Sequence, residues 1–288
     1  MQWGIGICKG DVAAVVRNQT IPRSITWLPL RHSLHFMADP FVFRSKKGNI
    51  ILLHEEFSAE VNGTIVLLEL DQQFNKLQEK TIYATGKHLS YPLITQKNGS
   101  VYVMPENHQQ QKLSRFRLDE QTWEFTDETS LISGIPLLDA TPLFHNSLYW
   151  LFATSGDGIN DNNALHLYYA ETEEGPYQAH AGNPVKNHLD GSRPAGSIIE
   201  YEGQLYRPTQ NCGEYYGKSI TLQRITELNT ERFSEEPVFD IHPDPNGPFP
   251  SGLHTINSAD GILVIDGIRF VFKPWLKFKM ALRNKFKR

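Results

Sequence analysis

Four carboxylates in this sequence stand where acid–base chemistry could use them, in polar breaks between short apolar runs. Asp39 precedes a proline, Glu106 follows one, Asp139 lies in the segment LLDATP, and Glu56 lies near the end of the segment IILLHEEF. Carboxyl groups act as general acids and bases, one form donating a proton and the other accepting it. We therefore predict Asp39, Asp139, Glu106 and Glu56 as catalytic residues.

A second set of side chains is suited to binding a sugar or an anion. Arginine can hold a phosphate or carboxylate with two parallel hydrogen bonds, and an aromatic ring can stack on the face of a sugar. The predicted substrate-binding residues are Tyr91, Arg193, Arg207, Gln210 and His254. Members of both sets also have ordinary structural explanations, such as a turn aspartate or a hydrogen-bonded core histidine.

These residues recur at similar places in a repeated β-hairpin. Residues 38–57 contain two apolar runs around a polar turn that ends in Gly48-Asn49, which is the pattern of a hairpin. Four of the five copies align on a proline and the fifth on a threonine: Pro40, Pro92, Pro142, Pro194 and Thr255. The prolines are 52, 50 and 52 residues apart, and a β-hairpin that repeats about every 50 residues indicates propeller blades. We therefore predict an all-β fold, a five-bladed β-propeller.

The repeat predicts how residues far apart in the sequence would meet. The inner strands of all blades start at the same rim of a propeller, and each hairpin returns its second strand to that rim. We predict residues 1–268 as one propeller domain, with the strand Trp3 to Cys8 completing the last blade and a further short strand from Val12 to Val16. A linker rich in proline and glycine, 240–250, leads into the fifth blade.

The composition fits a large β-core and argues against several other classes of protein. The chain has 288 residues, 40% of them hydrophobic, and no apolar run of about 18 residues that could span a membrane. Two cysteines are too few for a disulfide framework, and the N-terminus lacks the pattern of a signal peptide, so we expect a cytoplasmic protein. Since no nucleotide-binding glycine loop and no C-x-x-C or H-E-x-x-H motif occurs, we expect no cofactor and no metal.

The last residues, 269–288, form a separate basic tail. They carry eight basic side chains and no acid, which leaves 20 basic and 32 acidic residues in 1–268. The apolar residues of 274–288 recur at helical spacing: Trp275, Phe278, Leu282 and Phe286. This pattern predicts a short C-terminal amphipathic helix that binds an anionic membrane surface peripherally. A disordered tail or a helix packed on the propeller are the alternatives, and the acidic body argues against nucleic acid as a partner.

The motifs MADPF, LSYP, DATPLF, SRPAG, LYRPTQNC and GLHT carry a resemblance to known families. A five-bladed propeller with Asp-Pro at the start of its first inner strand resembles glycoside hydrolase family 43. The motif set, over residues 3–267, resembles more closely the propeller domain found next to plant glucosamine inositolphosphorylceramide transferases. Similar domains appear in bacterial proteins associated with surface-polysaccharide synthesis. The resemblance to family 43 implies that Asp39 is a general base and that Asp139 tunes a pKa and orients the sugar.

The sequence departs from the hydrolase pattern at the third carboxylate. Family 43 enzymes place a glutamate general acid early in blade four, where this chain has Arg193 in the segment GSRPAG. Arginine cannot donate a proton at neutral pH, so Glu55, Glu56 or Glu106 would have to supply the acid. We expect Arg193 to bind an anionic group and to favour the ionised form of Asp39.

These observations together predict a carbohydrate-active enzyme of cell-surface polysaccharide biosynthesis. The first hypothesis is a glycosyltransferase that transfers a glycosyl group to a lipid-linked or phosphorylated sugar acceptor at the cytosolic membrane face, with a sugar nucleotide as a candidate substrate. The second is a glycoside hydrolase of the family 43 type. A third, from another class, is a non-catalytic glycan-binding module that serves a partner transferase.

Overall fold

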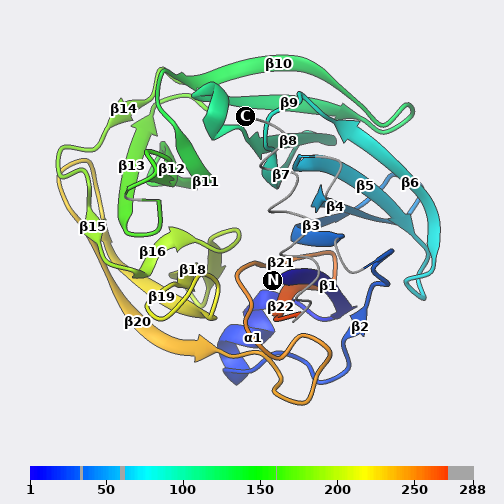
Figure 1. The fold of residues 1–288 in the computed structure, drawn as a ribbon. Helices are drawn as coiled ribbons and strands as arrows, with labels where there is room; N and C mark the ends of the chain where they lie inside the picture. Colours follow the sequence, from blue (N-terminus) through cyan, green and yellow to red (C-terminus); the bar gives the residue numbers. More distant parts are fainter. Residues whose placement is uncertain (33–34, 59–61, 160, 272–288) are drawn as a thin grey trace, which may run out of the picture.

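The computed structural model describes residues 1–32, 35–58, 62–159 and 161–271. Their strands form five antiparallel sheets around a common axis, which confirms the predicted five-bladed β-propeller (Figure 1). The predicted helix at 274–288 lies outside the described residues. Within the described ranges, no helix is both long and apolar enough to cross a lipid bilayer.

The first four blades follow one another along the chain, each running from an inner to an outer strand. Blade one contains β3 (Phe36–Arg44), β4 (Ile50–Phe57), β5 (Thr64–Leu70) and β6 (Lys76–Tyr83). Blade two contains β7 (Ser90–Lys97), β8 (Ser100–Glu106), β9 (Lys112–Asp119) and β10 (Glu124–Ser133), with a 3-10 turn at His108–Gln110. Blade three contains β11 (Leu137–His145), β12 (Leu148–Ser155), β13 (Ala164–Ala170), β14 (Gln178–Ala179) and β15 (Lys186–Asn187). Blade four contains β16 (Asp190–Pro194), β17 (Ile199–Tyr201), β18 (Gln204–Asn211), β19 (Ser219–Leu228) and β20 (Phe233–Ile241).

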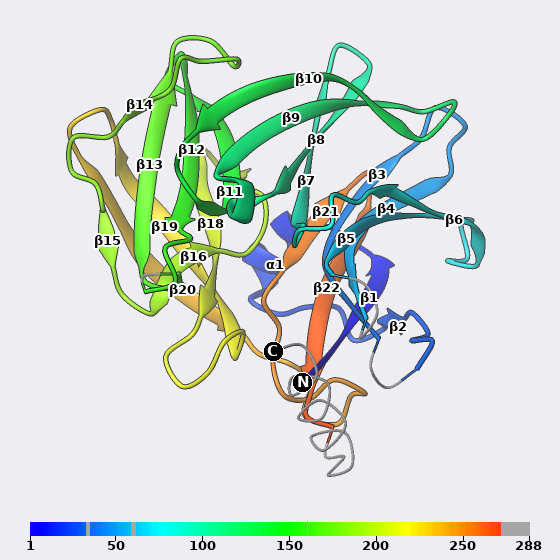
Figure 2. The same cartoon turned by 45° about the horizontal axis from the view of Figure 1, so that its top comes forward.

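The fifth blade joins the two ends of the propeller. Its strands are β21 (Ile256–Ala259), β22 (Ile262–Arg269), β1 (Gln2–Lys9) and β2 (Thr26–Trp27). Strand β1 pairs with β22 along its whole length, from Gln2 opposite Arg269 to Lys9 opposite Ile262. Figure 2 shows the dark blue β1 beside the orange β22. This pairing confirms that the N-terminal strand completes the last blade and closes the ring.

The segment predicted as a short strand at 12–16 is instead a helix, α1 (Val12–Asn18). Asp11 caps its N-terminus, because the side chain accepts a hydrogen bond from the Ala14 amide at 2.6 Å. Val12, Val15 and Val16 are its buried residues, and this spacing puts them on one helical face. The β-branched residues suggested a strand, but the cap and the one-sided burial against blades four and five favour the helix.

Apolar side chains fill each of the five contacts between neighbouring blades. Leu52 and Leu68 of blade one, for example, pack with Ile5 and Val264 of blade five, and four further clusters occupy the other contacts. Such burial contributes roughly 25 cal/mol per Å² of apolar surface. With the blade faces packed in this way, polar residues near the axis can serve purposes other than stability.

Candidate functional site at the propeller axis

Three inner strands begin with the same backbone distortion, which aims their residues at the axis. Asp39, Tyr91 and Asp139 have φ angles of 53°, 42° and 52°, and each lies in a β-bulge. Aspartate tolerates this left-handed conformation, whereas tyrosine adopts it rarely. The bulge in blade three falls at Asp139 rather than beside Pro142. The alignment on Pro142 was therefore two residues out of register with the structure.

Asp39 is buried and held by two neighbouring blades. Its Oδ2 accepts a hydrogen bond from the Tyr91 amide at 3.2 Å, and its Oδ1 accepts one from Thr255 Oγ1 at 2.8 Å. His254 Nε2 lies 3.5 Å from the same Oδ1. Burial raises the pKa of Asp39, and the nearby His254 only partly opposes this. The expectation that Arg193 keeps Asp39 ionised was wrong, since the arginine binds a different aspartate.

His254 links Asp39 to a second buried aspartate, Asp266. The distance between His254 Nδ1 and Asp266 Oδ2 is 2.6 Å, and Asp266 Oδ1 accepts the backbone amides of His254 and Thr255 at 2.9 and 3.0 Å. The Trp3 ring stacks on the imidazole, with 4.0 Å between centroids. Burial disfavours the imidazolium, but the charges of Asp266 and Asp39 raise the pKa of His254 above its ordinary value.

Asp139 is the carboxylate that Arg193 binds. Arg193 Nε donates to Asp139 Oδ2 at 2.5 Å, and Gln210 Nε2 donates to the same oxygen at 3.0 Å. Burial raises the pKa of Asp139 to about 6, although Arg193 lowers it. The guanidinium also lies over the Tyr216 ring, 5.1 Å from its centroid. Because Tyr216 packs edge-on against His254, this ring connects the Asp139 pair to the Asp39 pair.

Glu106 holds the backbone of Asp139 in place. Its Oε2 accepts the Asp139 amide at 2.9 Å, and its Oε1 lies 2.8 Å from His108 Nδ1. Burial would raise the pKa of Glu106, but the bond from His108 and the charge of Arg193 bring it below the usual value. An ionised carboxylate with both oxygens engaged is suited to positioning Asp139, and it is a poor proton donor.

Two adjacent glutamates on β4 face opposite sides, as alternation along a strand requires. Glu55 points toward the axis, where its Oε1 lies 3.5 Å from His88 Nε2. Burial, together with the charges of Asp39, Glu106 and Asp139, raises the pKa of Glu55 well above its usual value. Glu56 instead pairs with Arg31 and His35 on the far face. Glu56 therefore does not join the axial site, and Glu55 takes its place.

Two residues predicted to bind substrate have structural roles instead. Tyr91 is fully buried, and its hydroxyl lies 2.9 Å from Thr141 Oγ1 and accepts the Gly196 amide at 2.8 Å. This hydroxyl joins blades two, three and four, and no ring face remains for a sugar. Arg207 is also fully buried, and it binds Glu235 with Nε at 2.9 Å and Nη2 at 2.6 Å. It supports blade four away from the axis.

The residues brought together around the axis are therefore Asp39, Glu55, Glu106, Asp139, Arg193, Gln210, His254 and Asp266. Trp3, His88 and His108 complete their surroundings, and sequence reasoning did not single them out. Trp3 reaches the axis only because β1 closes the ring. His108 follows Glu106 by two residues, and that proximity was the one signal that could have identified it.

Asp39, His254 and Asp266 form a group that could in principle bind a metal. Each offers one ligand atom, and these atoms lie within 4.8 Å of one another. A carboxylate–imidazole set of this kind suits divalent cations. The carboxylates, however, already accept hydrogen bonds from backbone amides and Thr255, and a cation would have to displace some of these. The structure thus favours a hydrogen-bonded charge network at this place.

The axial network combines the groups that glycosyl chemistry uses. Burial raises the pKa of the Glu55 carboxyl well above its usual value. Asp39 and Asp139 are carboxyls whose raised pKa makes them stronger bases, and Arg193 is a fixed cation. Two solved structures share this propeller fold. A family 117 glycoside hydrolase from Zobellia galactanivorans matches with a TM-score of 0.56 and 12% identity, covering 96% of this chain and 98% of that one.

A second solved structure is a glycoside hydrolase family 43 protein from Bacillus licheniformis. It matches with a TM-score of 0.53 and 13% identity over 74% of this chain and 46% of its own. Such low identities show the shared fold only. The chain thus shares its propeller fold with these two proteins.

The family itself is identified by sequence. Residues 24–245 match the family described as glucosamine inositolphosphorylceramide transferase 1, N-terminal, and the chain belongs to this family. Transferases of that name are 31% identical in Oryza sativa subsp. japonica and 34% in Arabidopsis thaliana, each over 71% of this chain. The matches span only 28% and 27% of those relatives.

Proposed function

We propose that this protein acts in cell-surface glycan biosynthesis by transferring a glycosyl group between a phosphorylated or lipid-linked sugar and an acceptor hydroxyl. The observation that carries the proposal is Arg193, which stands in blade four where the hydrolase resemblance leads us to expect a proton donor. A phosphate leaving group departs as a stable anion, so it needs a cation beside it rather than an acid. Arg193 meets that need.

The other axial residues have roles that fit such a transfer. Asp39 would take the proton from the acceptor hydroxyl, because its raised pKa makes it a stronger base than an exposed aspartate. Asp139 and Gln210 hold Arg193 and the bulged strand in place. The contacts described for Arg193 use Nε and one hydrogen of Nη1, which donates to Asn162 at 3.1 Å. Since a guanidinium has five N–H groups, donors remain for a phosphate.

A second function, glycan recognition without catalysis, is favoured by two specific observations. Both oxygens of Asp39 already accept hydrogen bonds from the protein, which reduces its freedom to act as a base. The curated transferases are also more than three times as long as the matched segment, so their reaction could take place in another part of those chains. In that case the axial network would bind the glycan that a partner domain modifies.

The proposed setting is the cytoplasmic surface of a membrane. Supporting it are the eight basic residues and no acid in 269–288, with the apolar stripe of 274–288. Anionic lipids attract such segments by about 1 kcal/mol for each basic residue near the surface. A lipid-linked sugar would then be presented close to the propeller.

Binding and turnover measured side by side test the two functions. Wild type and the Asp39→Asn and Arg193→Ala variants would be titrated with a sugar 1-phosphate, a sugar nucleotide and a methyl glycoside, and then assayed for transfer to an alcohol acceptor. A transferase prefers the phosphorylated probes, loses that preference in Arg193→Ala, and loses turnover but not binding in Asp39→Asn. Arg224→Ala, which removes a partly exposed arginine paired with Glu236, is the matched control. Binding without turnover in the wild type would establish the recognition module instead.

A further inference from the structure

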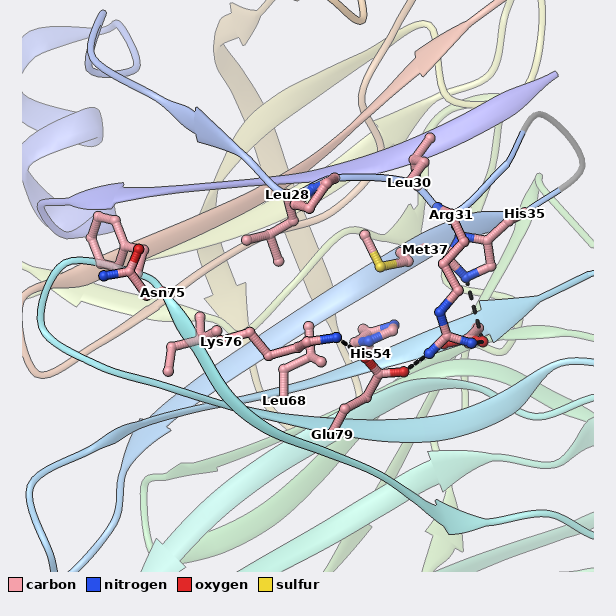
Figure 3. A pocket seen from close by; sticks show the side chains of 14 residues that line it. Leu28, Leu30, Arg31, His35, Met37, His54, Leu68, Asn75, Lys76 and Glu79 are labelled. Atoms are coloured by element: carbon pink, nitrogen blue, oxygen red, sulfur yellow. Dashed lines mark hydrogen bonds and ion pairs between the residues drawn. The ribbon is translucent and has the colours of Figure 1, made fainter.

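A cavity separate from the axial network lies between blades one and five. Its volume is about 410 Å³, within the range of sites that hold small organic ligands. Strands β4, β5 and β6 supply one side and the segment 28–31 after β2 supplies the other (Figure 3). Its lining residues include Leu28, Leu30, Arg31, His35, Met37, His54, Glu56, Leu68, Leu70, Phe74, Lys76 and Glu79.

One side of the cavity is apolar. Leu28, Met37, Leu68 and Leu70 are buried members of the hydrophobic cluster between the two blades. Leu30 and Phe74 are partly buried and pack against the same cluster. A ligand with an aliphatic body would therefore contact apolar side chains from two blades and remove their surface from water.

The polar side of the cavity carries balanced charges. Arg31 pairs with Glu56 and Glu79, and Lys76 Nζ lies 2.8 Å from Glu79 Oε2. His35 Nε2 lies 3.4 Å from Glu56 Oε1. Two cations and two carboxylates thus neutralise one another around the opening. A charged ligand would have to break one of these pairs, so the site favours a neutral molecule.

His54 supplies a hydrogen-bond acceptor within this lining. Its Nδ1 lies 2.9 Å from the Glu55 carbonyl oxygen, which can only accept, so the proton of a neutral ring lies on Nδ1. Its Nε2 is then an acceptor. The ring is fully buried, and Nε2 has no hydrogen-bond partner among the residues that the structure describes. Burial lowers the pKa of His54 to about 4, so the ring is neutral near pH 7. Buried polar atoms normally have a partner, because leaving one unpaired costs free energy.

We propose that this cavity is a binding site for a neutral ligand with an aliphatic body and a hydroxyl group that donates to His54 Nε2. The aliphatic body lies along Leu28, Met37, Leu68 and Leu70. The site is distinct from the axial network because His54 and Glu55 are consecutive on β4 and face opposite sides of the strand. The inference is therefore independent of the glycosyl transfer proposed above.

Two ligands of equal size distinguish binding that includes a hydrogen bond from binding by hydrophobic contact alone. 1-Octanol and 1-methoxyheptane have the same number of heavy atoms, but only the alcohol can donate a hydrogen bond. Calorimetric titration of the wild-type protein should show binding of the alcohol that is tighter by a factor on the order of ten, the worth of one hydrogen bond to a buried partner. The Met37 methyl resonance in a ¹³C spectrum should shift during the same titration.

Variants locate the bound ligand. His54→Phe should bind both ligands equally, since it keeps a ring but removes the acceptor, and Leu30→Trp should weaken both by filling the cavity from its partly exposed side. His166→Phe, which alters a half-buried histidine on β13 outside the lining, is the control and should keep the preference. Equal binding of alcohol and ether to the wild type, or no binding of either, would overturn the proposal without any variant. A preference that persists in folded His54→Phe would do the same.

Discussion

Arg193 binds Asp139 and not Asp39. The distance from Arg193 Nε to Asp139 Oδ2 is 2.5 Å, whereas the charged partner beside Asp39 is His254, 3.5 Å away. The axial residues therefore divide into two linked pairs, one of aspartate with arginine and one of aspartate with histidine. Under the proposed function, Arg193 of the first pair would bind the sugar phosphate and Asp39 of the second pair would accept the proton.

Asp39→Asn should abolish turnover and leave the free energy of unfolding within about 1 kcal/mol of the wild-type value. Asparagine can keep its oxygen toward the Tyr91 amide and its amide toward Thr255 Oγ1, and it tolerates the φ of 53°. Chemical denaturation and a transfer assay measure the two effects. Asp127→Asn, at an exposed aspartate paired with Arg117, is the control, and an Asp39→Asn variant with full activity would remove Asp39 as the base.

Arg193→Ala should weaken the binding of a phosphorylated sugar by about 10- to 100-fold, the loss of a charge-assisted hydrogen bond. It should also raise the pKa of Asp139 above its value of about 6, because Arg193 lowers that pKa. If catalysis needs ionised Asp139, the acid limb of the pH–rate profile moves to higher pH. Arg193→Lys separates charge from geometry, since lysine keeps the charge but not the bidentate fork. Unchanged affinity in both variants would contradict a phosphate-binding role.

Glu55→Gln and Glu56→Gln should change the free energy of unfolding with opposite pH dependence. Burial raises the pKa of Glu55 in the folded state, so the folded form binds more protons and the wild type loses stability as pH rises above the unfolded value. Glu55→Gln removes this loss. The free energy of unfolding of the variant, relative to that of the wild type, should therefore increase with pH by up to about 1.4 kcal/mol per pH unit.

Glu56 behaves in the opposite way, because its pKa is lowered mainly by the hydrogen bond with His35. Its contribution is present above the unfolded pKa and disappears as pH falls through the folded pKa. Glu56→Gln should thus be less stable than the wild type at pH 7 and equal to it at low pH. Urea denaturation from about pH 3 to pH 8 covers the range in which both glutamates titrate. Parallel curves for the two variants would show that the two glutamates have similar environments.

Tyr91→Phe should lower the free energy of unfolding by about 1–3 kcal/mol, because it leaves the buried Gly196 amide without its acceptor. Sugar affinity should be unaffected at temperatures where the variant is folded. Tyr102→Phe is the matched control, at a partly buried tyrosine whose ring lies 4.6 Å from Arg115, and it should change stability by less than about 0.5 kcal/mol. A Tyr91→Phe variant of normal stability but weakened sugar binding would restore Tyr91 as a ligand of the substrate.

Deleting residues 274–288 should release the protein from vesicles that contain anionic lipid. The reason is the loss of the apolar stripe and its surrounding cations. Vesicle flotation measures binding, and a thermal melt should show a midpoint lowered by only a few degrees. Replacing Trp275 and Phe278 by serine, which keeps every charge, tests the apolar part separately. Unfolding or aggregation of the truncated protein would show that the segment belongs to the fold.

The sequence by itself determined the architecture and most of the residues that meet near the axis. Strand hairpins spaced about 50 residues apart leave few folds other than a propeller. The repeat also put Asp39, Glu106, Asp139, Arg193 and His254 at one end of their strands. These conclusions depend on the spacing of the repeats, and a register error of one or two residues within a repeat does not change that spacing appreciably.

Only the tertiary structure decided what each of those residues does. A shift of one residue along β4 exchanges the two faces of the strand, so the sequence could not choose between Glu55 and Glu56. The choice of partner for Arg193 depends on distances between blades, and the direction of each pKa shift depends on burial and neighbouring charges. The fully buried Tyr91 and Arg207 resemble ligands in the sequence. Contacts with residues distant in the sequence bury both side chains, and no local sequence pattern predicts such contacts.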